Sequence, residues 1–119
     1  MNLELEKLTG KIIECAIAVH KKLGPGFLES IYQAAMPLEL VKQGLKVETQ
    51  KEIKVFYDGK EIGLHRIDLG QVIIELKAVK GFDDSHLAQL LSYLKASELR
   101  VGLLLNFAKA VLKIKRVIN

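Results

Sequence analysis

An apolar stretch at residues 72–79, interrupted by charges, constrains the fold of this chain more than any other feature. It reads Val-Ile-Ile-Glu-Leu-Lys-Ala-Val, so apolar residues occupy both alternating positions while Glu75 and Lys77 fall inside the run. Apolar residues on both faces are typical of a strand in the middle of a sheet. A buried charge without a partner costs on the order of several kcal/mol, so Glu75 and Lys77 require partners or a metal ion.

Asp68 is the nearest candidate to share a site with these charges. If residues 70–71 form a two-residue turn, Asp68 faces Ile73 and lies diagonal to Glu75. The period of two then places Asp68, Glu75 and Lys77 on one face. Diagonal neighbours are about 7 Å apart at the backbone, so two carboxylates here could bind a hard divalent cation. The competing interpretation is a solvated strand edge with an ion pair, and the apolar residues at both positions count against it.

Two amphipathic helices precede this strand. Apolar residues recur at intervals of three and four from about Leu3 to Leu23, and the Gly-Pro-Gly of residues 24–26 ends that helix. A second helix is expected from about Leu28 to Gln43, with Gly44 as its stop. Pro37 lacks a backbone donor, so we expect a kink there.

The remaining pattern alternates strands with one more helix. Residues 45–57 alternate in polarity, and an Asp58-Gly59 turn sends the chain back antiparallel through residues 60–67. After the helix of residues 85–98, residues 101–107 read as a buried strand parallel to residues 72–79. Residues 111–118 close the sheet at an edge. The expected fold is α/β, with element order α-α-β-β-β-α-β-β in one domain spanning residues 1–119.

The helix of residues 85–98 has two different faces. Its N-cap candidates are Asp83, Asp84 and Ser85. Its apolar face is expected to pack on the sheet through Leu87, Leu90, Leu91 and Leu94. The opposite face carries His86, Gln89 and Tyr93. Because a short connection joins this helix to the strand before it, Gln89 and Tyr93 are expected to point towards Glu75.

Charge and composition bound the partners and the compartment. The formal net charge is +4, which permits a polyanionic partner. From Lys109 to the end there are four basic residues and no acids, which predicts a phosphate-facing strip or a solvated terminal strand. The single cysteine, Cys15, is expected to be buried, and sparse His and Cys argue against zinc. No apolar run is long enough to span a bilayer and no signal sequence is visible, so we expect a cytoplasmic protein without a membrane partner.

Several segments resemble one family in the same order. Residues 26–32, Gly-Phe-Leu-Glu-Ser-Ile-Tyr, match the motif of the GxxExxY family. The blocks Arg66-Ile67-Asp68, Ile74 to Val79, His86 to Leu94 and Gly102 to Phe107 are also similar to that family. The resemblance runs from about Ala18 to Val117. It implies membership of the PD-(D/E)xK nuclease superfamily, whose restriction-endonuclease-like fold is a mixed central sheet flanked by helices.

The resemblance also implies a site and a reaction. Asp68 and Glu75 resemble the acids that bind Mg²⁺ or Mn²⁺, with the Leu76 carbonyl as a further ligand. Lys77 resembles the catalytic lysine, and Glu29 matches an additional helix acid that belongs to the catalytic set. The residues expected to bind nucleic acid or support the acids are Gln89, Tyr93, His86, Arg66 and Tyr32. The reaction would be metal-dependent hydrolysis of phosphodiester bonds in DNA or RNA.

Three functions remain open on the sequence. The first is the metal-dependent nuclease, and the second is a catalytically weak module that binds nucleic acid or protein and retains the nuclease fold. The third is a structural homo-oligomer in which the acids pair with Lys77 and Arg66. The presence of Asp68, Glu75 and Lys77 together favours the first function. The connection between Asp68 and Glu75, shorter than is usual in the family, favours the second.

Overall fold

The computed structural model describes residues 3–68 and 70–119, and for residues 3, 50–57 and 61–68 it describes the backbone alone. Its elements are, in chain order, α1 (Leu3–Leu23), α2 (Glu29–Lys42), β1 (Glu48–Tyr57), β2 (Lys60–Asp68), β3 (Val72–Lys77), α3 (Asp84–Ser97), β4 (Val101–Asn106) and β5 (Lys113–Ile118). This order confirms the one that the sequence predicts, with boundaries shifted by a few residues at most element ends.

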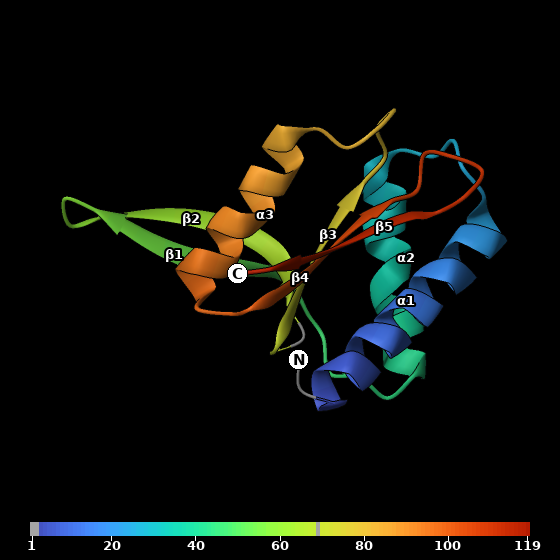
Figure 1. The fold of residues 1–119 in the computed structure, drawn as a ribbon, viewed down its shortest axis with the longest axis horizontal. Coiled ribbons are helices and arrows are strands. Elements are labelled where there is room, and N and C mark those ends of the chain that lie inside the picture. Colours follow the sequence, from blue (N-terminus) through green and yellow to red (C-terminus); the bar gives the residue numbers. More distant parts are fainter. Residues whose placement is uncertain (1–2, 69) are drawn as a thin grey trace.

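The strands form a mixed five-stranded sheet in the order β1-β2-β3-β4-β5. Neighbouring strands are antiparallel, except that β3 and β4 run parallel and are connected through α3. A parallel pair requires such a crossover connection. Strand β3 therefore lies at the centre of the sheet and β5 at an edge, as predicted (Figure 1).

Helices α1 and α2 cover one face of the sheet, and α3 covers the other. From β3, Val72, Ile74 and Leu76 pack into the core on the side of α1 and α2. Ile73 packs with Leu104 and with α3 residues on the other side. Figure 1 shows the same division, with α1 and α2 on one side of β3 and β4 and α3 on the other. The side-chain period of two therefore assigns Glu75 and Lys77 to the α3 face, because they share the parity of Ile73.

Two turns set the path into β3. Asp58 and Gly59 both have positive φ angles, 50° and 75°, as a two-residue primed hairpin turn requires. Gly70 also has a positive φ of 85° before β3. Backbone pairing of Asp68 with Ile73 confirms the register that the sequence predicts for this second turn.

The α1 and α2 side contains the larger part of the described core. Cys15 is 2% exposed and has no disulfide partner, as expected. Helix α2 continues through Pro37.

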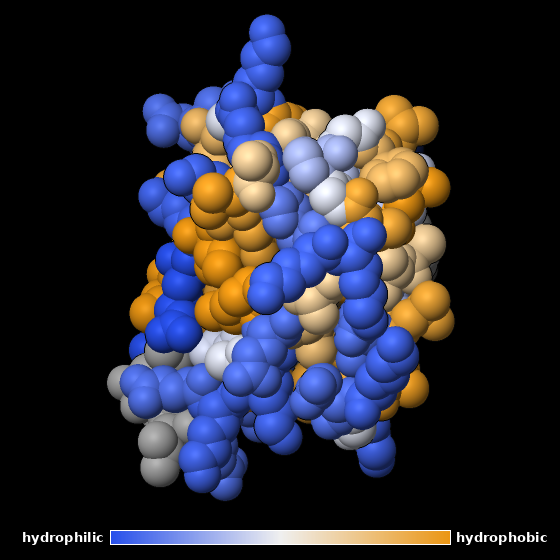
Figure 2. All heavy atoms as spheres, turned by 90° about the vertical axis from the view of Figure 1, so that its right-hand side faces the viewer, coloured by the Kyte–Doolittle hydropathy of each residue, from blue (hydrophilic) through white to orange (hydrophobic). Residues whose placement is uncertain are grey.

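Figure 2 faces this side of the molecule and shows hydrophobic areas among hydrophilic ones. The exposed apolar residues of the α2 region are Phe27, Leu28, Ile31, Leu38 and Val41. In the part of the chain that the structure describes, no helix combines the length and hydropathy of a membrane span.

Candidate functional site

Glu75 and Lys77 contact each other on the α3 face of β3. The Nζ atom of Lys77 lies 3.2 Å from Oε1 of Glu75. Glu75 is 4% exposed, and the Lys77 side chain is 16% exposed. Side chains two residues apart on a strand project from the same face, so Glu75 and Lys77 can contact each other within β3 alone. The ammonium group offsets the cost of burying the carboxylate.

Helix α3 contributes a third polar group to this cluster. The Nζ atom of Lys77 also donates a hydrogen bond to Oε1 of Gln89, at 3.4 Å. A lysine ammonium has three N–H donors, and the described contacts use two of them. Counting only the side chains that the structure describes, one donor of Lys77 is left for a water molecule or a phosphate oxygen.

The start of α3 is fixed by a capping box. The Asp83 carboxylate accepts hydrogen bonds from the backbone N–H groups of Ser85 and His86, at 2.9 and 3.2 Å. In return, Nδ1 of His86 accepts one from the Asp83 backbone N–H at 3.0 Å. These bonds satisfy donors that the first helical turn leaves free. His86, predicted to contact nucleic acid or support the acids, supports the helix that presents Gln89.

Tyr93 differs from the sequence expectation. We expected it opposite the leucines of α3, but it is 2% exposed and packs with Leu90, Leu94 and Ile73. The physical reason is Gly102 on β4, where an added Cβ would lie 2.9 Å from Cδ1 of Leu90. Leu90 lies directly over this glycine. Compared with the orientation that the leucine spacing predicts, α3 is therefore rotated about its axis, and Tyr93 lies on the buried face. Leu87 and Leu91 lie at its margin, partly buried.

The backbone at Leu76 lies beyond the described pairing of β3 with β2. The Lys77 carbonyl accepts a hydrogen bond from the Phe107 N–H on the β4 side, at 2.9 Å. Successive carbonyls of a strand alternate in direction, so the Leu76 carbonyl points to the β2 side. Pairing between β2 and β3 ends at Ile67 and Ile74, and the β1–β2 hairpin extends away from β3 beyond that point (Figure 1). The Leu76 carbonyl therefore points to the β2 side of β3, beyond the last described pair of these two strands.

Two predicted site residues, Asp68 and Arg66, have side chains outside the described part of the structure. Their backbone lies in β2, and the pairing of Asp68 with Ile73 is the register on which the predicted site depends. The assignments of Asp68 as a metal ligand and of Arg66 as a supporting residue stay predictions.

Glu29 and Tyr32 lie on α2, against the opposite face of the sheet from Gln89. The Glu29 carboxylate accepts a hydrogen bond from Gln33 at 3.2 Å, and none of its described contacts is with Glu75 or Lys77. Tyr32 is fully buried and its ring stacks on Phe107 at 4.6 Å. Its hydroxyl donates to the Gly24 carbonyl at 2.7 Å, which fixes the loop between the helices. The catalytic role of Glu29 stays a prediction.

Asn106, at the end of β4, is a structural residue that the sequence reasoning missed. Its buried side chain donates to the Val79 carbonyl at 2.9 Å and accepts from the Val79 and Ala108 N–H groups, at 3.1 and 3.2 Å. These bonds replace sheet pairing, which explains why β3 ends at Lys77 rather than at Val79. A polar residue closing an otherwise apolar strand was the available signal.

A divalent cation matches the type of donor present. Carboxylate and carbonyl oxygens, here from Glu75 and Leu76, are ligands that Mg²⁺ prefers. Among the described side chains, no three His, Cys, Asp or Glu residues gather into a metal centre. Of the two acids predicted to bind the metal ion, Glu75 is the one whose side chain is described, and Asp68 would be the second.

A family model described as the PD-(D/E)XK nuclease superfamily matches residues 6–117. The chain belongs to this superfamily, whose nucleases act on nucleic acids and generally depend on divalent metal ions. The mixed sheet flanked by helices agrees with its restriction-endonuclease-like fold. Neither a curated protein nor a solved structure matched the chain.

Proposed function

We propose that this protein is a metal-dependent nuclease that hydrolyses phosphodiester bonds of DNA or RNA. The observation that carries the proposal is the contact of Lys77 with both Glu75 and Gln89, at the end of the central strand. In a chain of the nuclease superfamily, this is where an acid and a lysine of the catalytic set are expected. The resemblance to GxxExxY proteins in residues 26–32 supports the same function.

Each residue of the site would have a separate role in hydrolysis. Glu75, the Leu76 carbonyl and Asp68 would hold Mg²⁺ or Mn²⁺, which when bound supplies charge stabilisation at the scissile phosphate. A third donor of Lys77 would orient the attacking water, or the phosphate oxygen next to it. Gln89 fixes the position of the Lys77 ammonium group, since it accepts one of its hydrogen bonds.

A calorimetric titration with Mn²⁺, paired with a cleavage assay on labelled single- and double-stranded oligonucleotides, tests this function. We expect wild type to bind the ion and to cleave. Glu75→Gln, which keeps the shape of the side chain, should lose ion binding and reduce cleavage by at least about a hundredfold. Glu14→Gln, at an exposed position of α1, is the matched control and should behave as wild type.

Wild type that binds no divalent ion, even with oligonucleotide present, would overturn the nuclease function. In that case binding of oligonucleotide without cleavage would support the alternative, a module that retains the nuclease fold for recognition.

A further inference from the structure

The strand register extends the candidate site sideways across the sheet. Two rows of paired residues run from β3 through β4 to β5: Glu75–Leu104–Lys115 and Lys77–Asn106–Lys113. Directly paired residues project to the same face of a sheet. Val117, two residues after Lys115, packs into the cluster beneath α3, which assigns Lys113 and Lys115 to that face. They lie two strand spacings, roughly 10 Å, from Lys77 and Glu75.

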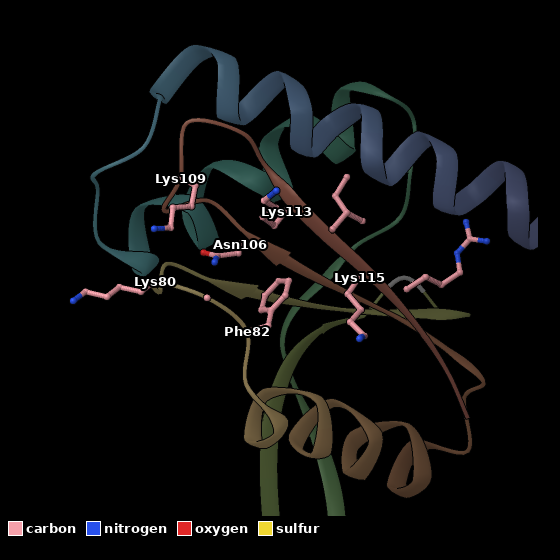
Figure 3. Close-up of a pocket in the computed structure, with 9 residues that line it drawn as sticks. Lys80, Phe82, Asn106, Lys109, Lys113 and Lys115 are labelled. Atoms are coloured by element: carbon pink, nitrogen blue, oxygen red, sulfur yellow. The ribbon is translucent and has the colours of Figure 1, made fainter.

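These lysines line a hollow between β5 and the loop that follows β3 (Figure 3). Its volume is about 590 Å³, within the usual range for small-ligand sites. Lys80 and Lys109 line it as well, and none of its described lining residues is acidic. Arg116 also borders it, but its guanidinium donates to the Thr9 hydroxyl of α1 at 2.8 Å. The hollow is therefore a concentrated cationic surface.

The frame of this hollow is fixed by buried hydrogen bonds. Asn106 ties the start of the loop after β3 to the loop after β4 through Val79 and Ala108. His20 of α1 lies 2.8 Å from the Lys109 carbonyl, and its Nε2 donates that hydrogen bond. The backbone around Lys80 and Lys109 is thereby positioned before any ligand arrives, which reduces the entropy cost of binding.

An aromatic ring adds a second kind of contact. Phe82 lines the hollow together with Lys113 and Lys115, and Figure 3 shows its ring and the Lys115 side chain on the side of the strands that faces α3. The ring packs against the cluster beneath α3 and contacts His86 edge-on, with centroids 6.3 Å apart. Proteins that bind single-stranded nucleic acids combine a cationic groove with aromatic rings on which bases stack. Bases within a duplex are stacked on one another and offer no free face to such a ring.

We propose that this hollow binds a single-stranded segment of nucleic acid, with phosphates at Lys113 and Lys115 and a base against Phe82. The inference rests on the proposed function, because it names the form of substrate that would lead into the Glu75–Lys77 cluster. Lys113 and Lys115 share rows with the two site residues, so a strand bound there crosses the sheet towards the site.

Fluorescence anisotropy tests the cationic part of the proposal. The probes are labelled oligothymidine and oligouridine of about twelve nucleotides, and a hairpin duplex, all in EDTA so that no cleavage occurs. Lys113→Gln/Lys115→Gln should weaken single-strand binding at least tenfold. The slope of log affinity against log salt, which is negative, should also become shallower by about 1.4, since each phosphate contact contributes about −0.7. Lys11→Gln/Lys21→Gln removes the same charge from exposed positions of α1 and should change binding less than threefold.

Phe82→Leu tests the stacking part while keeping an apolar side chain against α3. We expect roughly tenfold weaker binding of both single-stranded probes and no change for the duplex. Melting curves and size-exclusion profiles of each variant establish that it is folded and monodisperse. Should Phe82→Leu unfold, Phe82→Tyr, which retains the ring, must bind single strands as wild type does.

Two results would overturn the proposal: a double lysine variant that loses no more affinity than its control, or a duplex that binds as tightly as the single strands. Tighter binding of either single-stranded probe than of the duplex supports the proposal, and the tighter of the two shows whether the hollow prefers DNA or RNA. The proposed function fails separately. Wild type that binds the probes through Lys113 and Lys115 in EDTA but does not cleave them with Mn²⁺ would retain this inference and lose only the nuclease activity.

Discussion

Lys77 Nζ lies 3.2 Å from Glu75 Oε1, and the two side chains neutralise each other on the α3 face of the central strand. The same two groups belong to the proposed catalytic set. Substitutions at either position therefore affect both the stability of the fold and the chemistry of the site, and the two effects must be measured separately.

The first prediction concerns the ion pair. Lys77→Met should lower the free energy of unfolding by about 2–3 kcal/mol, because it removes the positive charge that lies 3.2 Å from the buried Glu75 carboxylate. This value is below the usual range for fully buried pairs because Lys77 retains some contact with solvent. Urea denaturation measures it, with Lys95→Met, at an exposed position of α3, as the control. An unfolding free energy equal to wild type would show that the pair does not stabilise the fold.

Gln89 should influence turnover without supporting the fold. Gln89→Met fills similar space but offers no strong acceptor to Lys77, so we expect the cleavage rate at saturating substrate to fall several-fold with KM nearly unchanged. The free energy of unfolding should stay within about 0.5 kcal/mol of wild type, since the residue is exposed. Full turnover in Gln89→Met would leave Gln89 without a positioning role.

Two glycines should respond in opposite ways to the same change. At Gly102 an added Cβ would approach Leu90 Cδ1 to 2.9 Å, so Gly102→Ala should destabilise the protein by about 1–3 kcal/mol. At Gly10, within α1, nothing lies within 4 Å of an added Cβ. Gly10→Ala should therefore stabilise by about 0.5–1 kcal/mol through helix propensity. Denaturation of both variants decides the matter, and equal signs would contradict the described packing of α3.

The cap of α3 should depend on pH. The side-chain hydrogen bond from Ser85 is the largest cause that lowers the pKa of Asp83, and backbone N–H groups lower it further. A carboxyl with a lowered folded pKa stabilises the protein above its unfolded pKa, near 4, and loses that contribution as the pH falls through the folded value. Asp83→Ala should therefore have a lower Tm than wild type at pH 7, and the difference should shrink below about pH 4.

Asp84→Ala is the control for this measurement, because it removes a neighbouring exposed carboxylate without touching the cap. A Tm difference for Asp83→Ala that stays constant from pH 7 to pH 3 would contradict the charged form of the cap.

Local patterns were sufficient to predict the element order and the turn before β3. Turn length fixes strand parity, so two residues between Leu69 and Val72 were enough to predict the pairing of Asp68 with Ile73. Glu75 and Lys77 were identified because charges inside a two-sided apolar strand need partners. Those predictions required information only from residues close to one another in the sequence.

The rotation of α3 could not be predicted from its own sequence. Leucine spacing indicates the centre of an apolar stripe, but Gly102 on β4 decides which leucine lies deepest. The basic residues of the C-terminal segment were likewise seen as one group. Strand alternation places Arg116, which donates to Thr9, on the opposite face of the sheet from Lys113 and Lys115. The strand order of the sheet is needed to see that these two lysines lie in the same rows as the site residues.

The position of β5 at the sheet edge gives its lysines another consequence. An edge strand presents free backbone N–H and C=O groups on which a second chain can add by forming a further strand. Charged side chains oppose such addition, and Lys113, Lys115 and Arg116 place three of them in six residues of β5. Protection of the edge against pairing with another chain and the proposed phosphate contacts thus favour the same residues, so an aggregation assay could reveal the loss of these lysines before any enzymatic assay does.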